Sequence, residues 1–209
     1  MATVKYSVSR EIPVVREVDV AVFGGGPGGL GAAVTAARAG AKTLLVERYA
    51  ALGGMASYGE VHPFMTNHAS GTCLDRPVYV DWVKEMKTYL APSNPFGKVD
   101  SDEVSSGKDR QIHKEAAMLG SESLCQKAGV DLLYHHSLAD VIMDGNRVDT
   151  AILFSKSGYT AVKAKAFVDC TGDADLAARA GCKFEFGGPS GFCQPMTLCF
   201  KLSHIDKSR

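Results

Sequence analysis

The sequence has no excess of charge of either sign. Its 209 residues contain 23 Lys and Arg and 23 Asp and Glu, so the formal net charge is zero. Surfaces that bind nucleic acid or anionic lipid usually carry a clear basic excess. We therefore expect neither nucleic acid nor a membrane as a partner, whereas a small molecule needs no such charge. The oligomeric state stays open.

Long uninterrupted apolar segments are also missing. The first ten residues contain no run that could form the apolar core of a signal peptide. Residues 18–46 are apolar overall, but seven glycines and Arg38 interrupt them, so a membrane span is not expected. The six cysteines are scattered without a CxxC pair, and neither they nor the histidines have metal-ligand spacing. This usage predicts reduced thiols, no metal site and a cytoplasmic location.

Glycine is the residue type in excess, with 22 of 209 residues or about 10.5%, against ~7% in an average protein. Seven of these glycines lie between Gly24 and Gly40, which indicates a local requirement of the backbone. Residues 18–23 and 43–46 are typical of buried strands, and residues 28–39 predict a helix capped by Gly40. Strand, helix and strand within about 30 residues predict a βαβ unit with parallel strands.

The rest of the chain predicts further helices and strands. A helix after Asp75, with Asp75 as its cap, would have an apolar face of Tyr79, Trp82, Val83, Met86 and Leu90. Residues 92–109 lack periodicity and predict an exposed, mobile loop. A second helix, ending at Gly129, would turn inward Ile112, Ala116, Leu119, Ser123 and Leu124. Strands are expected at residues 130–135, 138–143, 148–154, 159–165, 166–169 and 196–202, and a short helix at residues 173–181.

The glycine cluster contains a dinucleotide-binding motif. Gly24, Gly26 and Gly29 satisfy G-x-G-x-x-G between the predicted strand and helix. The first glycine permits a tight turn, the second lets a pyrophosphate approach the helix N-terminus, and the third allows close helix–strand packing. Glu47, 23 residues after Gly24, is placed to accept hydrogen bonds from ribose hydroxyls and to disfavour a 2′-phosphate. The alternative is a helix-capping turn with an unrelated surface glutamate.

The residues that follow Glu47 extend this pattern. Arg48 comes next, and then Leu52-Gly53-Gly54-Met55-Ala56. Residues 24–55 resemble the two-dinucleotide-binding flavoproteins. Residues 18–202 resemble the FAD-dependent oxidoreductase family through GGPGGLGAA…ER…LGGMA, through DCTGDADLA at residues 169–177 and through QPMTL at residues 194–198.

The resemblance implies that the chain binds FAD in an extended form. It places the pyrophosphate over residues 24–29, the ribose on Glu47, the ribityl chain near Gly54 and the adenine near Leu138, although Leu138 fits a plain core strand equally well. The implied cofactor-binding residues are Gly24, Gly26, Pro27, Gly28, Gly29, Glu47, Arg48, Gly53, Gly54, Met55, Leu138, Thr171 and Gly172. Asp173 and Asp175 are more typical of residues that complement a helix dipole than of ligands.

The expected fold is α/β, with a Rossmann-type parallel sheet, an antiparallel hairpin layer over residues 148–165 and the start of a second, substrate-side sheet near Met196. We expect an FAD-binding domain at residues 17–186, with an irregular and helical insertion at residues 58–110. Residues 187–209 would begin a truncated substrate domain, with an exposed edge strand at residues 196–202.

The implied function is a flavin-mediated hydride or electron transfer on a small-molecule substrate. Two alternatives stay open: an NAD(H)-binding dehydrogenase domain, and an FAD-binding fragment without catalysis. Residues 53–59 lack the cysteine pair of the pyridine-nucleotide disulfide reductases, so exchange by that mechanism is not expected. No catalytic residue is identified. His62 is one candidate acid or base, although a loop histidine is more often merely solvated.

Overall fold

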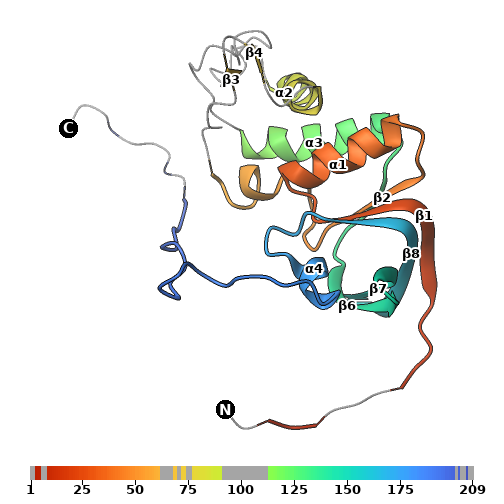
Figure 1. The fold of residues 1–209 in the computed structure, drawn as a ribbon. Helices are drawn as coiled ribbons and strands as arrows, with labels where there is room; N and C mark the ends of the chain where they lie inside the picture. The colour runs from red at the N-terminus through yellow and green to blue at the C-terminus, as the bar shows by residue number, and fades with distance from the viewer. Residues whose placement is uncertain are drawn as a thin grey trace.

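The computed structural model describes residues 3–5, 9–61, 68–69, 72–73, 77–90, 113–200, 202 and 206. Figure 1 shows its central sheet with helices on both sides. The elements in chain order are β1 (Val14–Phe23), α1 (Pro27–Arg38), β2 (Thr43–Val46), the 3-10 turn η1 (Gly54–Ala56), β3 (His68–Ala69), β4 (Thr72–Cys73), α2 (Val78–Thr88), α3 (Lys114–Ala128), β5 (Asp131–Leu133), β6 (Ser137–Asp144), β7 (Arg147–Ser155), β8 (Gly158–Asp169) and α4 (Asp175–Arg179).

Six of the strands form one mixed sheet in the order β5-β2-β1-β8-β7-β6. β1 pairs in parallel with β2 and with β8, and β2 pairs in parallel with β5. β6, β7 and β8 continue as an antiparallel meander at the other edge. The predicted α/β fold, with a parallel sheet and an antiparallel part, is therefore confirmed. The βαβ unit of β1, α1 and β2 matches the predicted ranges within a few residues.

One boundary inside this sheet was predicted wrongly. We expected separate strands at residues 159–165 and 166–169, but β8 runs unbroken from Gly158 to Asp169. Neither Lys165 nor Ala166 is a turn-forming residue, and β8 pairs with β1 both before and after this point. The antiparallel hairpin is consequently part of the same sheet as the parallel strands.

Two hydrophobic cores lie on opposite faces of the sheet, because successive residues of β1 point to opposite faces. Val22 faces the first core, which α1, α2 and α3 complete, whereas Ala21 and Phe23 face the second. The second core lies between the parallel strands and the curled meander, and Leu176 of α4 contributes to it. In Figure 1 the three long helices lie above the sheet, while β6, β7 and α4 lie below.

The helices follow the predicted apolar patterns with some differences. Trp82, Val83 and Met86 of α2 are buried as expected, but α2 begins after Pro77, and Asp75 lies outside the described residues. α3 ends at Gly129, as predicted, but Leu119 is 49% exposed. α3 packs closely against α2 at Gly120, where a Cβ would lie 2.9 Å from the Met86 nitrogen. Only a narrow face of α3 is therefore buried, and Leu119 lies outside this face. The loop predicted at residues 92–109, and Ile112, are outside the described residues.

The prediction of a strand at residues 196–202 was wrong. Residues 192–200 have no strand, and Met196 and Leu198 are 100% and 87% exposed. Alternation of apolar and polar residues produces a strand only where another strand pairs with it, and no described strand pairs with this segment. The expected start of a second sheet is therefore absent from the described residues. None of the helices in the described ranges has the length and apolar character needed to cross a bilayer.

Candidate functional site

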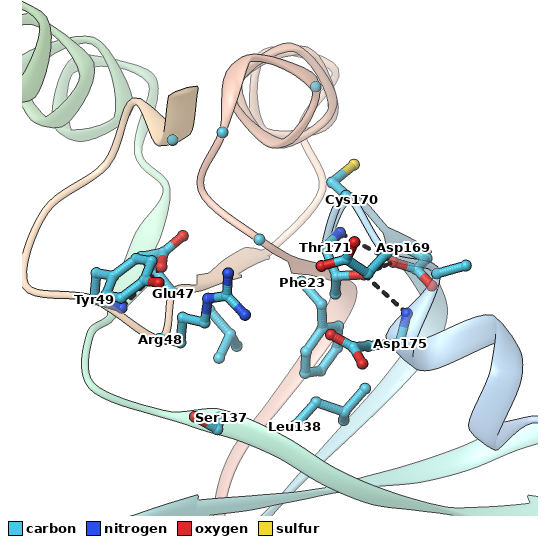
Figure 2. A pocket seen from close by; sticks show the side chains of 18 of the residues that line it. Phe23, Glu47, Arg48, Tyr49, Ser137, Leu138, Asp169, Cys170, Thr171 and Asp175 are labelled. Carbon is cyan, nitrogen blue, oxygen red and sulfur yellow. Dashed lines mark hydrogen bonds between the residues drawn. The ribbon is translucent and has the colours of Figure 1, made fainter. Parts of the chain in front are cut away.

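A large cavity opens at the carboxyl ends of the parallel strands. The ends of β1, β2 and β8 border it, and its volume is about 1250 Å³. Open α/β sheets bind ligands at this edge, and ~300–1,000 Å³ is usual for a small-molecule pocket. The cavity thus has room for an extended dinucleotide. Figure 2 shows side chains from three sides of it, namely Glu47, Arg48 and Tyr49, then Ser137 and Leu138, then Asp169, Cys170 and Thr171.

The first glycine turn requires its glycines for steric reasons. Gly24 has a φ of +96°, and a Cβ there would lie 2.2 Å from the carbonyl oxygen of Cys170. A Cβ on Gly29 would lie 1.8 Å from the carbonyl oxygen of Gly24. The predicted tight turn and close helix–strand packing are therefore confirmed. Gly26, in contrast, has an open side on the cavity, since a Cβ there would meet no atom closer than 3.9 Å.

The N-terminus of α1 is directed at this cavity. Gly26, Pro27 and Gly28 line it, and the helix hydrogen bonds start with the Leu30 N–H donating to the Gly26 carbonyl. Pro27 has no N–H, and within the described ranges no protein group accepts a hydrogen bond from the Gly28 N–H. A free amide at the positive end of a helix dipole attracts an anion. This end of α1 is suited to a phosphate.

Glu47 is held in the cavity wall by two backbone amides. Its Oε2 accepts a hydrogen bond from the Gly25 N–H at 2.7 Å, and its Oε1 accepts one from the Tyr49 N–H at 2.8 Å. Only 7% of the residue is exposed. An ionised carboxylate has about four acceptor positions, so capacity remains for a ligand hydroxyl. Glu47 is thus a part of the glycine turn, which excludes the alternative of an unrelated surface glutamate.

The second glycine pair packs against the first. The Gly53 N–H donates to the Gly25 carbonyl at 2.8 Å, and Gly53 has a φ of +103°. A Cβ on Gly54 would lie 2.8 Å from the Cα of Gly26. Close approach of the two backbones therefore explains why glycine occupies these positions. Gly54 and the exposed Met55 reach the cavity, while Gly53 lies behind them.

Two aromatic residues and an arginine stand at the Glu47 side of the cavity. The Arg48 guanidinium carbon lies 4.9 Å from the centre of the Tyr49 ring, within the range of a cation–π contact. The Tyr49 and Tyr58 rings are 4.7 Å apart. All three line the cavity, so this wall offers a positive charge and planar apolar surface. Arg48 was predicted as a site residue, whereas Tyr49 and Tyr58 were not.

The opposite wall is built around Asp169, which was not predicted as a site residue. Asp169 ends β8, and its Oδ1 accepts hydrogen bonds from the Thr171 N–H at 3.0 Å and from the Thr171 hydroxyl at 2.8 Å. Its Oδ2 accepts from the N–H groups of Leu176 at 3.0 Å and Ala177 at 2.9 Å. Partial burial opposes ionisation, but these hydrogen bonds outweigh it and lower the pKa of Asp169. Asp169 is therefore an anchored carboxylate.

Most of the predicted site residues meet in this one cavity. Those that line it are Gly24, Gly26, Pro27, Gly28, Glu47, Arg48, Gly54, Met55, Leu138, Thr171 and Gly172. Gly29 and Gly53 do not line it and support its walls instead. Leu138 also packs in the second core, so it belongs to both a core strand and the cavity. His62 lies outside the described residues.

Cys170 and His136 also line the cavity and were not predicted as site residues. Burial and the neighbouring Asp169 raise the pKa of the Cys170 thiol, so it is neutral at ordinary pH. The His136 Nδ1 lies 2.6 Å from the Tyr134 carbonyl oxygen. Neither is paired with a second reactive side chain among the described residues, which leaves the catalytic group unidentified.

A family model described as FAD dependent oxidoreductase matches residues 19–209 of the chain. A curated protein, the dihydrolipoyl dehydrogenase of Trypanosoma brucei brucei, is 53% identical over 45 residues, which are 22% of this chain and 9% of that protein. The first match spans nearly the whole chain, whereas the second is confined to a short segment.

Three solved structures have a similar fold. THI4 of Thermovibrio ammonificans superposes with a TM-score of 0.53 at 22% identity, covering 80% of this chain and 64% of that one. The 3-ketosteroid-delta4-(5alpha)-dehydrogenase of Rhodococcus jostii RHA1 superposes with a TM-score of 0.50 at 17% identity, covering 75% and 46%. A geranylgeranyl bacteriochlorophyll reductase-like protein of Thermoplasma acidophilum gives 0.50 at 22% identity, covering 80% and 43%. The chain thus spans 43–64% of the length of these proteins, and at such identities the likeness concerns the fold.

Proposed function

This chain belongs to the FAD-dependent oxidoreductase family, and on that premise we propose that it binds FAD in the cavity at the ends of β1, β2 and β8. One observation carries the proposal: a single cavity is lined by both glycine turns, by Glu47 and by the Thr171–Gly172 turn. Bound FAD supplies the hydride or electron transfer. The substrate is proposed to be a small molecule.

We place each part of FAD by the chemistry of the wall that it meets. The free amide end of α1 suits the pyrophosphate, and the remaining acceptor positions of Glu47 suit the ribose hydroxyls. We place the adenine between Arg48, which follows β2, and Leu138 of β6, because both residues line the cavity. The ribityl chain would pass along Gly54 and Met55. These residues bind and orient the cofactor.

The NAD(H) alternative explains fewer features of the cavity. It gives no role to Gly54 or Gly172, although both line the same cavity as the first glycine turn. An FAD-binding chain without turnover remains the second candidate. The described residues place no acid–base pair in the cavity, and oxidoreductase activity of the chain is therefore a separate proposal from FAD binding.

The test starts with the purified 209-residue protein. We expect yellow protein with flavin absorption bands, and we expect heat or acid to release FAD, identified by chromatography against FMN and NAD standards. Colourless protein that stays colourless after incubation with FAD, and binds NAD tightly, would overturn the proposal. Reduction of a dye in a substrate screen, compared with a longer version of the protein, separates catalysis from binding alone.

We also propose that residues 17–186 form the FAD-binding domain and that the protein is cytoplasmic and does not bind nucleic acid. The balanced charge supports the last point. The cysteines at positions 125, 170, 182, 193 and 199 are free thiols, as expected in a reducing compartment. Limited proteolysis tests the domain boundary, and cell fractionation tests the location.

A further inference from the structure

We propose that Asp169 is a positioning residue of the FAD site: its carboxylate closes the N-terminus of α4 and fixes the Thr171–Gly172 turn, which leaves the pyrophosphate to α1. The inference rests on the proposed FAD binding. It assigns Asp169 no contact with the reacting atoms. Figure 2 shows Asp169, Thr171 and Asp175 together at one side of the cavity.

The four hydrogen bonds to Asp169 divide into two pairs. One carboxylate oxygen holds the N–H and hydroxyl of Thr171, and the other holds the N–H groups of Leu176 and Ala177. The Thr171 hydroxyl oxygen also accepts from the Asp175 N–H at 2.9 Å. Asp169 and Thr171 together thus occupy the amides of residues 171, 175, 176 and 177. The backbone conformation of the turn is set by side chains of the protein.

The two helices at the cavity therefore differ in what they offer an anion. At α1, Gly28 lines the cavity, and its N–H has no protein acceptor in the described part of the chain. At α4, the first amides are already bonded, and the Asp169 carboxylate adds a negative charge beside them. If the N-terminus of α4 could also bind a phosphate, it would compete with the N-terminus of α1. Because Asp169 occupies the amides of α4, the pyrophosphate has a single binding position, at α1.

The same network reaches the third side of the cavity. The Arg179 guanidinium donates to the Ala139 carbonyl on β6 at 3.0 Å and to the Asp175 carboxylate at 3.0 Å. Ala139 is next to Leu138, which lines the cavity. α4 is therefore tied both to the end of β8, through Asp169, and to β6, through Arg179. Loosening the Asp169 end would disturb two walls of the site.

The decisive variant is Asp169→Asn. The amide keeps the shape but turns an NH₂ group toward one pair of donors, so two hydrogen bonds are lost. We expect at least a roughly tenfold weaker FAD affinity, equal to about 1.4 kcal/mol, measured by fluorescence titration of the flavin-free protein. We also expect a changed visible circular dichroism of the bound flavin. Asp140→Asn is the matched control, because Asp140 is exposed and lies outside the cavity lining.

A second pair of variants provides the test if Asp169→Asn does not fold. Thr171→Ser keeps the hydroxyl that bridges Asp169 and Asp175, whereas Thr171→Val removes it. We expect Thr171→Val to bind FAD about tenfold more weakly than Thr171→Ser. Equal binding by these two variants, or binding by Asp169→Asn as tight as by the control, overturns the inference while the FAD proposal stands.

Two further outcomes are informative. If Asp169→Asn lowers the stability of the flavin-free protein but leaves FAD affinity and the flavin spectrum unchanged, Asp169 is structural only and the inference fails. If the unaltered protein does not bind FAD, the proposed function and this inference fall together. The two failures are therefore distinguishable.

Discussion

Single residues with several hydrogen bonds hold the cavity walls in place. Glu47 joins the end of β2 to the glycine turn by accepting from Gly25 and Tyr49. Asp169 joins the end of β8 to α4 in the same manner. In both cases a carboxylate at a strand end receives backbone N–H groups, which are stronger donors to a charged acceptor than to a neutral one. Replacing either carboxylate with the uncharged amide of the same shape should therefore weaken these hydrogen bonds.

Glu47→Gln tests the importance of the carboxylate charge at the end of β2. The glutamine amide can accept only one of the two N–H groups and opposes the other with its own NH₂ group. We expect the free energy of unfolding of the flavin-free protein to fall by about 1–3 kcal/mol, measured by urea denaturation, and the FAD affinity to fall as well. Glu17→Gln, on an exposed residue of β1, is the control. A stability equal to that of the control would contradict the expectation.

The buried thiol of Cys125 gives a pH prediction. Burial first, and then the nearby Glu122, raise its pKa from 9.0 to about 12. The unfolded chain loses this proton above about pH 9 while the folded protein keeps it, so stability is full below pH 9 and falls as pH rises toward 12. Unfolding measured from pH 8 to 11 should show a steeper decline than in Cys125→Ala. The nearby Tyr134, whose pKa is also raised, is present in both proteins, and parallel declines would refute the assignment.

Not every site residue was visible in the sequence. The glycines and Glu47 were, because their spacing is set by local chain geometry between a strand and a helix. Asp169 was part of the DCTGDADLA motif but was not predicted as a site residue, although the i to i+2 hydrogen bond that it accepts from Thr171 is a common feature of Asp before a turn. Its other partners lie seven and eight residues on. The role of Asp169 therefore depends on how the turn folds back, which the residue pattern alone does not specify.

Helix α1 is packed on the sheet through a glycine. Gly29 lies against the Gly24 carbonyl, where a side chain would have no room, whereas a Cβ on Gly31 of the same helix would meet no atom within 4 Å. The two positions are two residues apart and differ in the face that they present. Substitutions at the two positions can therefore distinguish the requirement for close packing from the general destabilisation by glycine in a helix.

Gly29→Ala and Gly31→Ala form a matched pair. The first must push α1 away from the strand, and we expect a loss of roughly 1–3 kcal/mol in unfolding free energy together with weaker FAD binding. The second should raise stability by about 0.5–1 kcal/mol, because alanine has the higher helix propensity. Chemical denaturation and FAD titration of both variants provide the measurement. Equal effects of the two substitutions would argue against the packing role of Gly29.

The elements that the sequence predicted well are those specified by short-range pattern, such as the βαβ unit and the hairpin. The errors concern long-range pairing. Whether β8 breaks at Lys165 depends on its neighbour β1, and whether residues 196–202 form a strand depends on a partner strand. The exposure of Leu119 likewise depends on where α2 crosses α3. These interactions join segments far apart in the chain, and hydrophobic periodicity carries no information about them.

The C-terminal segment, residues 182–200 and 202, exposes an unusual amount of apolar surface. The large apolar side chains in this segment are 64–100% exposed, namely Phe184, Phe186, Phe192, Met196, Leu198, Phe200 and Leu202. Exposed apolar surface of this extent promotes association. The cavity is lined by residues that precede this segment in the chain, so the two properties should be separable.

Phe192→Ser combined with Phe200→Ser should reduce the fluorescence of a hydrophobic dye and the tendency to aggregate, measured by light scattering. The FAD affinity should remain within twofold, because neither phenylalanine lines the cavity. Lys183→Ser combined with Glu185→Ser is the matched control in the same segment. Dye binding that falls equally in both double variants would show that the apolar side chains are not the cause.

The continuity of β8 has a consequence for how the protein unfolds. Residues 161–169 pair with β1 in the parallel half, and residues 158–163 pair with β7 in the meander, so the same strand belongs to both halves. Neither half can unfold without breaking the hydrogen bonds along one edge of β8. The sheet should therefore unfold as one cooperative unit, and the amide hydrogens in the middle of β8 should exchange with deuterium only when the whole domain unfolds.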